Sequence, residues 1–381
     1  MTAVVVTDAE ERAVLGACRG LTRAGYRVCA VAHRRPAATH WSRSCDERVV
    51  LPDPRRSLEG FVEGLEALLR TGRYDVLIPG SEAALLAVSQ HRNRLERFTR
   101  LGLPSQEAVL RSVDKVTLHE AAAGAGLAQP PSRACADLLA AQAAATELGY
   151  PVVLKPAQSF HRVNGMLRQQ GVVVVHDGDA LVRAAKELAL PFIVQRYERA
   201  SFVSCTGVFA DGRLLALTTS RVLRLWPPNA GMHTFSETVQ APNGLTDRVQ
   251  DLLSATGWQG IFQLQMLELA DGRLSVIDLN PRVFASIALD DYAGANPAVV
   301  WCDWLLGRDP PPVVARPARR YRWEEGDLCH FAWQLRRGRL RAAVAAVLPR
   351  RRVTHSWFRV TDPGPIVARG LDLAFRTRGT A

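Results

Sequence analysis

Residues 260–282, GIFQLQMLELADGRLSVIDLNPR, decide how this chain folds. Two apolar runs flank residues 270–273, and the Asp271-Gly272 pair between them is typical of a tight turn that joins antiparallel strands. The stretch therefore predicts a β-hairpin.

The polar residues of this hairpin predict a metal site. Gln265 lies in the first strand, and Asp278 and Asn280 lie two residues apart in the second, so the latter two share a face. Side-chain oxygens on adjacent strands suit Mg²⁺, which keeps several waters and takes further ligands from phosphates. Arg282 continues the face and adds a planar cation. The alternative is a hairpin with an exposed polar edge.

Length and composition set the broad class. With 381 residues, the chain is longer than one compact core, so two or three domains are expected. No apolar run is long enough to span a membrane, and the first residues lack the pattern of a signal peptide, so we expect a cytoplasmic protein. Seven scattered cysteines without a C-x-x-C pair argue against disulfides and against a zinc site.

The lysines are rare enough to be informative. Of 48 basic residues, 45 are arginine, and the three lysines are Lys115, Lys155 and Lys186. A lysine that persists against this bias indicates a site where a compact ammonium must hold a phosphate. Lys115 and Lys155 are therefore candidates, whereas Lys186 lies in a helical pattern and is expected at the surface.

The first 107 residues alternate strand and helix patterns. Strands are expected at 3–6, 26–31, 49–51 and 75–78, which predicts an open parallel α/β sheet. No G-x-G-x-x-G follows the first strand, so a dinucleotide site lacks its phosphate loop. The turn at residues 79–82 could receive an anion at a helix N-terminus, but a plain capping turn is the preferred interpretation.

The middle of the chain carries both candidate lysines. A helix is expected to begin at Lys115, and the strand 151–156 places Lys155 near its end. The polar loop 157–171 can fold over phosphates through its backbone N–H groups and Arg168, with a mobile surface loop as the alternative. A strand at 192–197 and a hairpin around Asp211-Gly212 follow.

This order of parts resembles the ATP-grasp superfamily over about residues 105–308. The lysine after an aspartate, the strand YPVVLKP, the strand FIVQRYE and the QLQ…VIDLNPR pair carry the resemblance. The tract 220–231, SRVLRLWPPNAG, is further similar to uncharacterised ligases of the carbamoyl-phosphate-synthase-like branch.

The resemblance implies a fold class and a domain order. An open parallel α/β domain (1–107) is expected to precede a two-lobed ATP-grasp domain (108–310, with lobes at about 108–190 and 191–310). A basic, mostly helical C-terminal extension (311–381) is expected to follow. The class is therefore mixed, α/β and α+β.

The resemblance also implies roles for single residues. ATP and Mg²⁺ are the expected cofactors, and Mn²⁺ is expected to substitute for Mg²⁺. Gln265 falls where most members have a glutamate, Arg196 falls where a glutamate is common, and Asp278 is one methylene shorter than the usual glutamate. The expected sets are Lys115, Lys155, Arg168, Gln195, Arg196 and Tyr197 for ATP; Gln265, Asp278 and Asn280 for the metal; and Arg282, with Arg221 at the acceptor end, for catalysis. The histidines, including His161 and His233, are expected to be ordinary loop residues.

The function implied is an ADP-forming ligase that activates a carboxylate as an acyl-phosphate and transfers the acyl group to an amine. Two alternatives are a catalytically silent ATP-binding scaffold and a carboxylase- or carbamoyl-type enzyme that uses bicarbonate as the acid. The expected partners are small-molecule substrates rather than DNA, and a homodimer is a candidate assembly.

The C-terminal segment 311–381 holds 15 arginines against five acidic residues. One interpretation is contact with RNA or with an anionic membrane surface. The preferred interpretation is a helical cap with a solvated arginine-rich face, because the segment lacks aromatic interleaving and any known RNA-binding motif.

Overall fold

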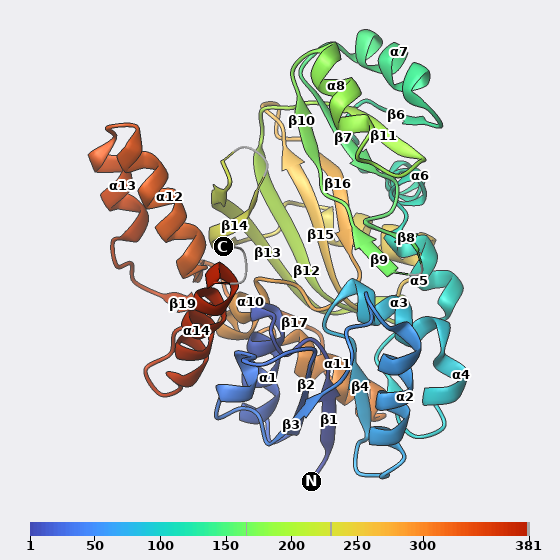
Figure 1. Cartoon of the computed structure of the whole chain (residues 1–381), viewed down its shortest axis with the longest axis vertical. Helices are drawn as coiled ribbons and strands as arrows, with labels where there is room; N and C mark the ends of the chain where they lie inside the picture. Colours follow the sequence, from blue (N-terminus) through green and yellow to red (C-terminus); the bar gives the residue numbers. More distant parts are fainter. Residues whose placement is uncertain (165, 229–230, 379–381) are drawn as a thin grey trace.

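The structure is a computed structural model that describes residues 1–164, 166–228 and 231–378. Residue 165 of the 157–171 loop, residues 229–230 of the 220–231 tract and residues 379–381 of the C-terminal segment lie outside the described residues. Figure 1 shows a parallel sheet near the N-terminus, a large central sheet and a smaller lobe stacked along the long axis. The mixed α/β class with a parallel sheet is confirmed.

The N-terminal sheet has the order β3-β2-β1-β4-β5 and is parallel throughout. The order reverses between β1 and β4, and in such sheets ligands bind at the carboxyl ends of the strands at this switch point. The elements are β1 (Ala3–Val6), α1 (Arg12–Arg23), β2 (Arg27–Ala32), a 3₁₀ turn (Thr39–Trp41), β3 (Glu47–Val50), α2 (Leu58–Leu69), β4 (Val76–Ile78), α3 (Glu82–Gln90), α4 (Arg92–Leu95) and β5 (Arg100–Leu101).

Helices α5 (Gln106–Val113) and α6 (Lys115–Gly124) lead into the small lobe, an antiparallel sheet of order β10-β7-β11-β6. Its core is formed by α7 and α8 packed on one face of the sheet. The elements are β6 (Ser132–Cys135), α7 (Leu138–Leu148), β7 (Val152–Pro156), β8 (Phe160–Val163), β9 (Met166–Gln169), β10 (Val173–Val175), α8 (Gly178–Ala185) and β11 (Phe192–Arg196).

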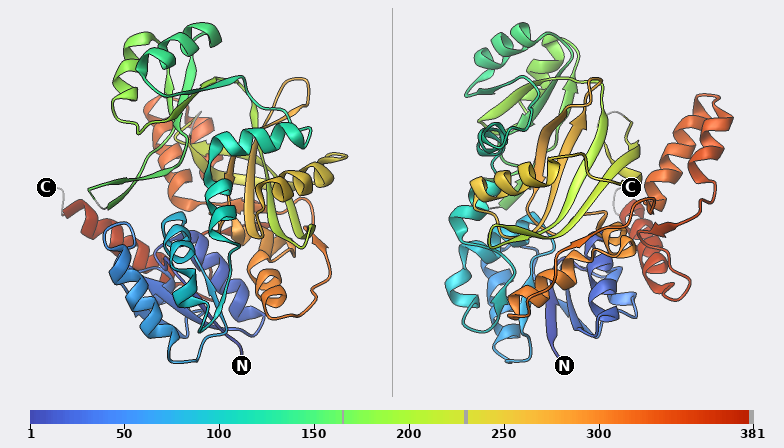
Figure 2. Two further views of the ribbon diagram at one scale, coloured as in Figure 1. Left: turned by 90° about the vertical axis from the view of Figure 1, so that its right-hand side faces the viewer. Right: turned by 180° about the vertical axis from the view of Figure 1, so that it is seen from behind.

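Strands β8 and β9 form a separate hairpin within the polar loop 157–171. The hairpin leaves the small lobe and reaches the N-terminal part, where Leu167 N donates to Arg55 O at 2.8 Å and Arg162 Nη2 donates to Gln90 Oε1 at 3.3 Å. The left view of Figure 2 shows this span. The hairpin therefore bridges two parts of the chain.

The central sheet runs β16-β15-β12-β13-β14-β18-β19 and contains the predicted hairpin as β15 and β16. The predicted turn at Asp211-Gly212 joins β12 to β13, and this prediction is confirmed. The elements are β12 (Ser201–Ala210), β13 (Arg213–Trp226), β14 (Met232–Val239), α9 (Leu245–Thr256), β15 (Gly260–Glu268), β16 (Leu274–Asn280), α10 (Ile287–Ala293) and α11 (Pro297–Leu305).

The C-terminal segment adds strands to this sheet, which the sequence did not predict. β17 pairs with β13, β18 with β14, and β19 with β18. Asp327 binds Arg224 of β13 at 2.5 Å and Arg322 at 3.0 Å, so part of the arginine excess braces the segment against the sheet. The elements are β17 (Val313–Val314), β18 (Arg320–Arg322), α12 (Glu324–Arg336), α13 (Leu340–Val347), β19 (Val353–His355) and α14 (Gly364–Arg378). Helices α12 and α13 project from the body (Figure 2, right).

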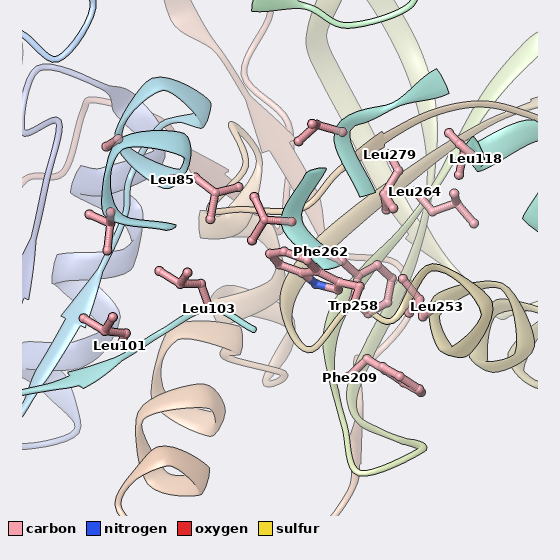
Figure 3. Close-up of a cluster of buried hydrophobic side chains, with 14 of the residues drawn as sticks. Leu85, Leu101, Leu103, Leu118, Phe209, Leu253, Trp258, Phe262, Leu264 and Leu279 are labelled. Carbon is pink, nitrogen blue, oxygen red and sulfur yellow. The ribbon is translucent and has the colours of Figure 1, made fainter. Parts of the chain in front are cut away.

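One apolar cluster joins the N-terminal sheet to the central sheet. Leu101 and Leu103 come from the N-terminal side. Leu253 comes from α9, Trp258 from the segment between α9 and β15, and Phe262 from β15 (Figure 3). Phe262 is completely buried in this cluster. The relative position of the two sheets, and of any site between them, thus depends on close packing.

Among the described residues, no helix combines the length and the apolarity that crossing a bilayer requires.

Replacing Phe262 by alanine is expected to destabilise the chain by about 3–5 kcal/mol, because a buried ring is lost and the cavity closes only partly. Chemical denaturation followed by fluorescence and circular dichroism measures the effect, and Phe358→Ala, at an exposed phenylalanine, is the matched control. A loss below about 1 kcal/mol for Phe262→Ala would show that the two sheets do not depend on this cluster.

Candidate active site

The first candidate lysine, Lys115, is positioned by a helix cap. Asp114 accepts hydrogen bonds from the backbone N–H groups of Val116 and Thr117, which fixes the start of α6. Lys115 is 6% exposed, and its Nζ donates to Ser159 Oγ at 2.9 Å and lies 3.5 Å from Asp278 Oδ1. Helix α6 therefore directs an ammonium group to the end of β16.

The second candidate lysine, Lys155, reaches the same place from β7. Its neighbour Leu154 points into the small-lobe core, so strand alternation turns Lys155 to the opposite face. Lys155 is 3% exposed, and its Nζ donates to the carbonyl of Ile277, next to Asp278, at 3.1 Å. Burial lowers the pKa of Lys155 to about 8, with Asp278 acting in the opposite direction.

The predicted hairpin face is formed as expected and contains one more residue. Gln265 lies directly opposite Asp278, and Gln263 lies directly opposite Asn280. Asn280 Nδ2 is 3.4 Å from Asp278 Oδ2 and 3.5 Å from Gln263 Oε1. Sequence reasoning missed Gln263, although its spacing of two from Gln265 carried the signal.

Arg282 extends this face beyond the end of β16. Its Nη2 donates to Asn280 Oδ1 and its Nη1 to Val283 O, both at 2.9 Å, and its Nε is buried without a partner among the described residues. The guanidinium is therefore held in place while part of its donor capacity stays open.

Glu82, from the N-terminal part, is a second residue that the sequence did not single out. It opens α3, where Ser81 Oγ accepts from Ala84 N, so the turn caps this helix. Burial raises the pKa of Glu82, while the nearby charges of Arg282 and Lys115 act to lower it. The carboxyl end of β4 thus brings an acidic group to the same site.

Gln195 lies beside Lys155 on the small-lobe face that turns away from α7. The register places Ile193 opposite Lys155 and Gln195 opposite Val153, and the Oε1 of Gln195 is buried without a partner among the described residues. A cavity of about 340 Å³ opens here between α6 and strands β6 and β11, and His119 and Ile193 line it. Burial and the two lysines lower the pKa of His119 to about 4, so its ring is neutral at neutral pH.

Arg196 does not share this face. It follows Gln195 by one residue, so its side chain turns toward α7, where its Nε donates to Leu148 O at 3.3 Å. The backbone N–H groups of Arg196 and Tyr197 donate to Pro131 O and Pro151 O. The structure thus places Gln195 on the sheet face that borders the cavity, opposite the lining residue Ser132, and turns the Arg196 side chain away from it.

Arg168 lies on the bridging hairpin, opposite His161 in register, and its side chain is exposed. The base of the same loop supplies Ser159, the partner of Lys115. The expectation that residues 157–171 cover the lysines therefore agrees with the path of the hairpin, and a phosphate contact for Arg168 stays a prediction.

Arg221 does not join the other site residues. In β12 and β13 the face shared with Gln265 contains Ser204 and Ser220, so Arg221 points to the opposite face. There it forms a bidentate ion pair with Glu268 at 2.8–3.1 Å. The structure offers no support for Arg221 at the acceptor end.

The two histidines that were expected in loops lie on strands instead, His161 on β8 and His233 on β14. Burial, together with the charge of Arg12, lowers the pKa of His233 to about 4.

The donor set fits a magnesium nucleotide better than a metal held by protein alone. Asp278 is the carboxylate of the hairpin face, and within the described residues no three His, Cys, Asp or Glu side chains converge. A cation here would need oxygen ligands from phosphates and water, which is how Mg²⁺ binds in phosphoryl-transfer sites. The two buried ammonium groups provide matching positive charge for such phosphates.

No protein-family model matches the chain. Solved structures do match over 84% of it. One is the ADP complex of PurK, N5-carboxyaminoimidazole ribonucleotide synthetase, with 15% identity, 80% of that chain covered and a TM-score of 0.64. Another is L-amino acid ligase from Bacillus licheniformis, with 15% identity, 78% of that chain covered and a TM-score of 0.62. A third is the biotin carboxylase domain of 2-oxoglutarate carboxylase from Hydrogenobacter thermophilus, determined with MgADP and bicarbonate. It has 16% identity, 73% of that chain is covered, and the TM-score is 0.65. At these identities the likeness speaks for the fold. The chain therefore has the ATP-grasp fold, as the IDLNPR hairpin and the two lysines indicated.

Proposed function

We propose that the chain is an ATP-dependent ligase that joins a carboxylate to an amine and releases ADP and phosphate. One observation carries the proposal: two of the three lysines, from separate elements, are buried and meet at Asp278. The two ammonium groups and the guanidinium of Arg282 outnumber the nearby carboxylates, Asp278 and Glu82, so positive charge is left without a partner among the described residues. Burying charge is costly unless a partner is supplied, and a polyphosphate supplies it.

ATP would bind with its base in the cavity beside Gln195 and its phosphates at Lys115 and Lys155, under the β8–β9 hairpin. The unpartnered Oε1 of Gln195 is a ready acceptor for an exocyclic amine. Asp278 and Asn280, with Gln265 or Gln263 opposite them, would hold Mg²⁺, which supplies charge neutralisation between the phosphates.

The chemistry is then two displacements. A carboxylate oxygen attacks the γ-phosphorus, an O–P bond forms, and ADP leaves, which produces an acyl-phosphate. The amine nitrogen attacks the acyl carbon, a C–N bond forms, and inorganic phosphate leaves. Arg282 would stabilise the negative charge on the carbonyl and phosphate oxygens, because its guanidinium is fixed in place before the reaction.

Glu82 is suited to take the proton that the amine loses. Its carboxyl group is buried, and burial raises its pKa above the ordinary value, which makes the ionised carboxylate a stronger base. Its neighbours in the site, Arg282 and Lys115, are the groups that hold the reacting phosphate in this proposal.

Bicarbonate as the acid is a second candidate within the same site. The similar carboxylase domain from Hydrogenobacter was determined with bicarbonate beside MgADP, whereas the similar Bacillus enzyme is an L-amino acid ligase. Because fold does not determine substrate, both acids belong in the first assay.

The first experiment is a pairwise screen of bicarbonate, amino acids and other small carboxylates against amines, scored for ADP release that requires both partners. With the best pair, Lys155→Ala and Asp278→Ala are expected to lower kcat/KM for ATP by about 10²–10³-fold, because each removes a charge that is preorganised for the phosphates. Lys186→Ala removes the third lysine, which is exposed, and should leave the rate unchanged.

If substrate-dependent ADP release is unchanged in Lys155→Ala and Asp278→Ala, the assignment of these two residues to the active site is wrong. Tight ATP binding with no productive pair would instead favour a nucleotide-binding scaffold.

The lowered pKa of Lys155 predicts a pH dependence. Below pH about 8 the free protein carries the ammonium form that phosphates need, and above it the neutral amine increases. The affinity for ATP should therefore fall by up to about tenfold per pH unit above pH 8. Calorimetric titration of ATP from pH 6.5 to 9.5 measures this fall. Lys155→Arg keeps its charge and should flatten the profile. If the ATP affinities of the wild type and of Lys155→Arg fall in parallel with pH, a group other than Lys155 controls the pH dependence.

A further inference from the structure

Arg12 is a cation near the proposed active site that the described residues do not neutralise. It opens α1, directly after the loop that follows β1. Its guanidinium stacks on the ring of Trp323 with 4.0 Å between Cζ and the ring centroid, and its Nη2 meets Met232 Sδ at 3.8 Å. Its Nε is buried without a partner, and no described carboxylate lies within ion-pair distance of it.

Glu10 and Glu324, two carboxylates close in sequence to Arg12 or to Trp323, contact other groups. Glu10 accepts from the backbone N–H of His33 and lies 3.9 Å from Arg34. Glu324, next to Trp323 in the chain, accepts from Ser356 Oγ and from the backbone N–H groups of Trp357 and Phe358. These acids are therefore engaged by groups other than Arg12.

Arg12 lies close, on one side, to the loop that follows Arg282. Its charge acts on the phenol of Tyr321, and the Tyr321 hydroxyl donates to Ala285 O at 3.0 Å. Ala285 is three residues beyond Arg282. The hydroxyl of Tyr321 thus connects the surroundings of Arg12 to the loop that positions Arg282.

The start of α1, which carries Arg12, also lies close to the strand end that presents Glu82. Gly80 N donates to Thr7 Oγ1 at 3.0 Å, and a Cβ added to Gly80 would lie 2.5 Å from a methyl group of Val14, two residues beyond Arg12. The start of α1 and the turn before Glu82 are therefore in direct contact. Arg12 and Glu82 lie at the same edge of the N-terminal sheet, where parallel sheets bind ligands.

The chemistry of this position favours an anion. A guanidinium whose one face is occupied by an indole ring is approached in its plane, and carboxylate and phosphate match the geometry of the N–H groups that Met232 and Tyr321 do not occupy. Arg12 is partly exposed and its neighbour Met232 is exposed, so a small molecule can reach it.

We propose that Arg12, held on the face of Trp323, binds a second anionic group of the molecule that reacts at Arg282. This inference rests on the proposed ligase function. The substrate class is then a dicarboxylate or a phosphorylated compound, with one group at the reaction centre and the other at Arg12. The C-terminal segment contributes Trp323, on which Arg12 stacks, and Tyr321 of β18, which gives this segment a functional role beside its structural one.

The test measures binding of inorganic phosphate, succinate and the monoacid propionate by calorimetry, at constant ionic strength. A non-hydrolysable ATP analogue with Mg²⁺ is present, so that the nucleotide phosphate site is filled. Arg12→Gln is expected to weaken the binding of phosphate or of succinate at least tenfold, and propionate should bind weakly to both proteins. The two dianions distinguish a phosphorylated substrate from a dicarboxylate.

The matched control is Arg337→Gln, which removes an exposed arginine that also stacks on a tryptophan, Trp333, at 4.2 Å but lies on the projecting α12–α13 pair. It should bind both anions as the wild type does. If Arg12→Gln does not fold, Arg12→Lys retains the charge and loses the planar stacking, and at least a fivefold loss is expected from it.

Equal affinities of wild type and the Arg12 variant for both dianions would overturn the proposal, as would an equal loss in Arg337→Gln. The titrations are repeated without the analogue. An Arg12-dependent difference there supports the anion site even if nucleotide fails to bind, whereas failure of nucleotide binding alone counts against the ligase function.

Discussion

The proposed site depends on two buried lysine ammonium groups that, together with Arg282, outnumber the nearby carboxylates Asp278 and Glu82. Lys115 and Lys155 are nearly inaccessible and are directed to the end of β16, where Asp278 cannot balance both charges. Burial, with a smaller contribution from the charge of Lys115, lowers the pKa of Lys155 to about 8. Excess positive charge in a buried site is typical of a functional site, and the phosphates of a bound substrate would balance this charge.

Three parts of the chain must keep their relative positions for this site to exist. Helix α6 brings Lys115, the small lobe brings Lys155, and the hairpin β15–β16 brings Asp278. The apolar cluster around Phe262 and Trp258 fixes the N-terminal sheet beneath them, and this sheet adds Glu82 and Arg12 at its carboxyl edge. The C-terminal segment joins the central sheet by short strands and supplies the ring on which Arg12 rests.

Local patterns in the sequence predicted the hairpin, the two lysines and the N-terminal parallel sheet, because strand alternation, turn residues and residue rarity are properties of short stretches. They could not predict Glu82, whose role depends on contact between elements that are distant in sequence. Arg221 was assigned by resemblance, and the register of β13 turns it to the other face. The strands of the C-terminal segment have two or three residues, too few to show a period. The domain boundaries at 107 and 310 stay predictions.

The most direct test of the central claim is a crystal structure with Mn²⁺ in place of Mg²⁺ and a non-hydrolysable ATP analogue. Anomalous scattering would locate the metal independently of the density for the nucleotide. We expect a manganese peak within coordination distance of Asp278, with analogue phosphates in hydrogen-bond reach of both Lys115 Nζ and Lys155 Nζ. A peak or a nucleotide bound elsewhere, with these two lysines still facing Asp278 alone, would contradict this expectation.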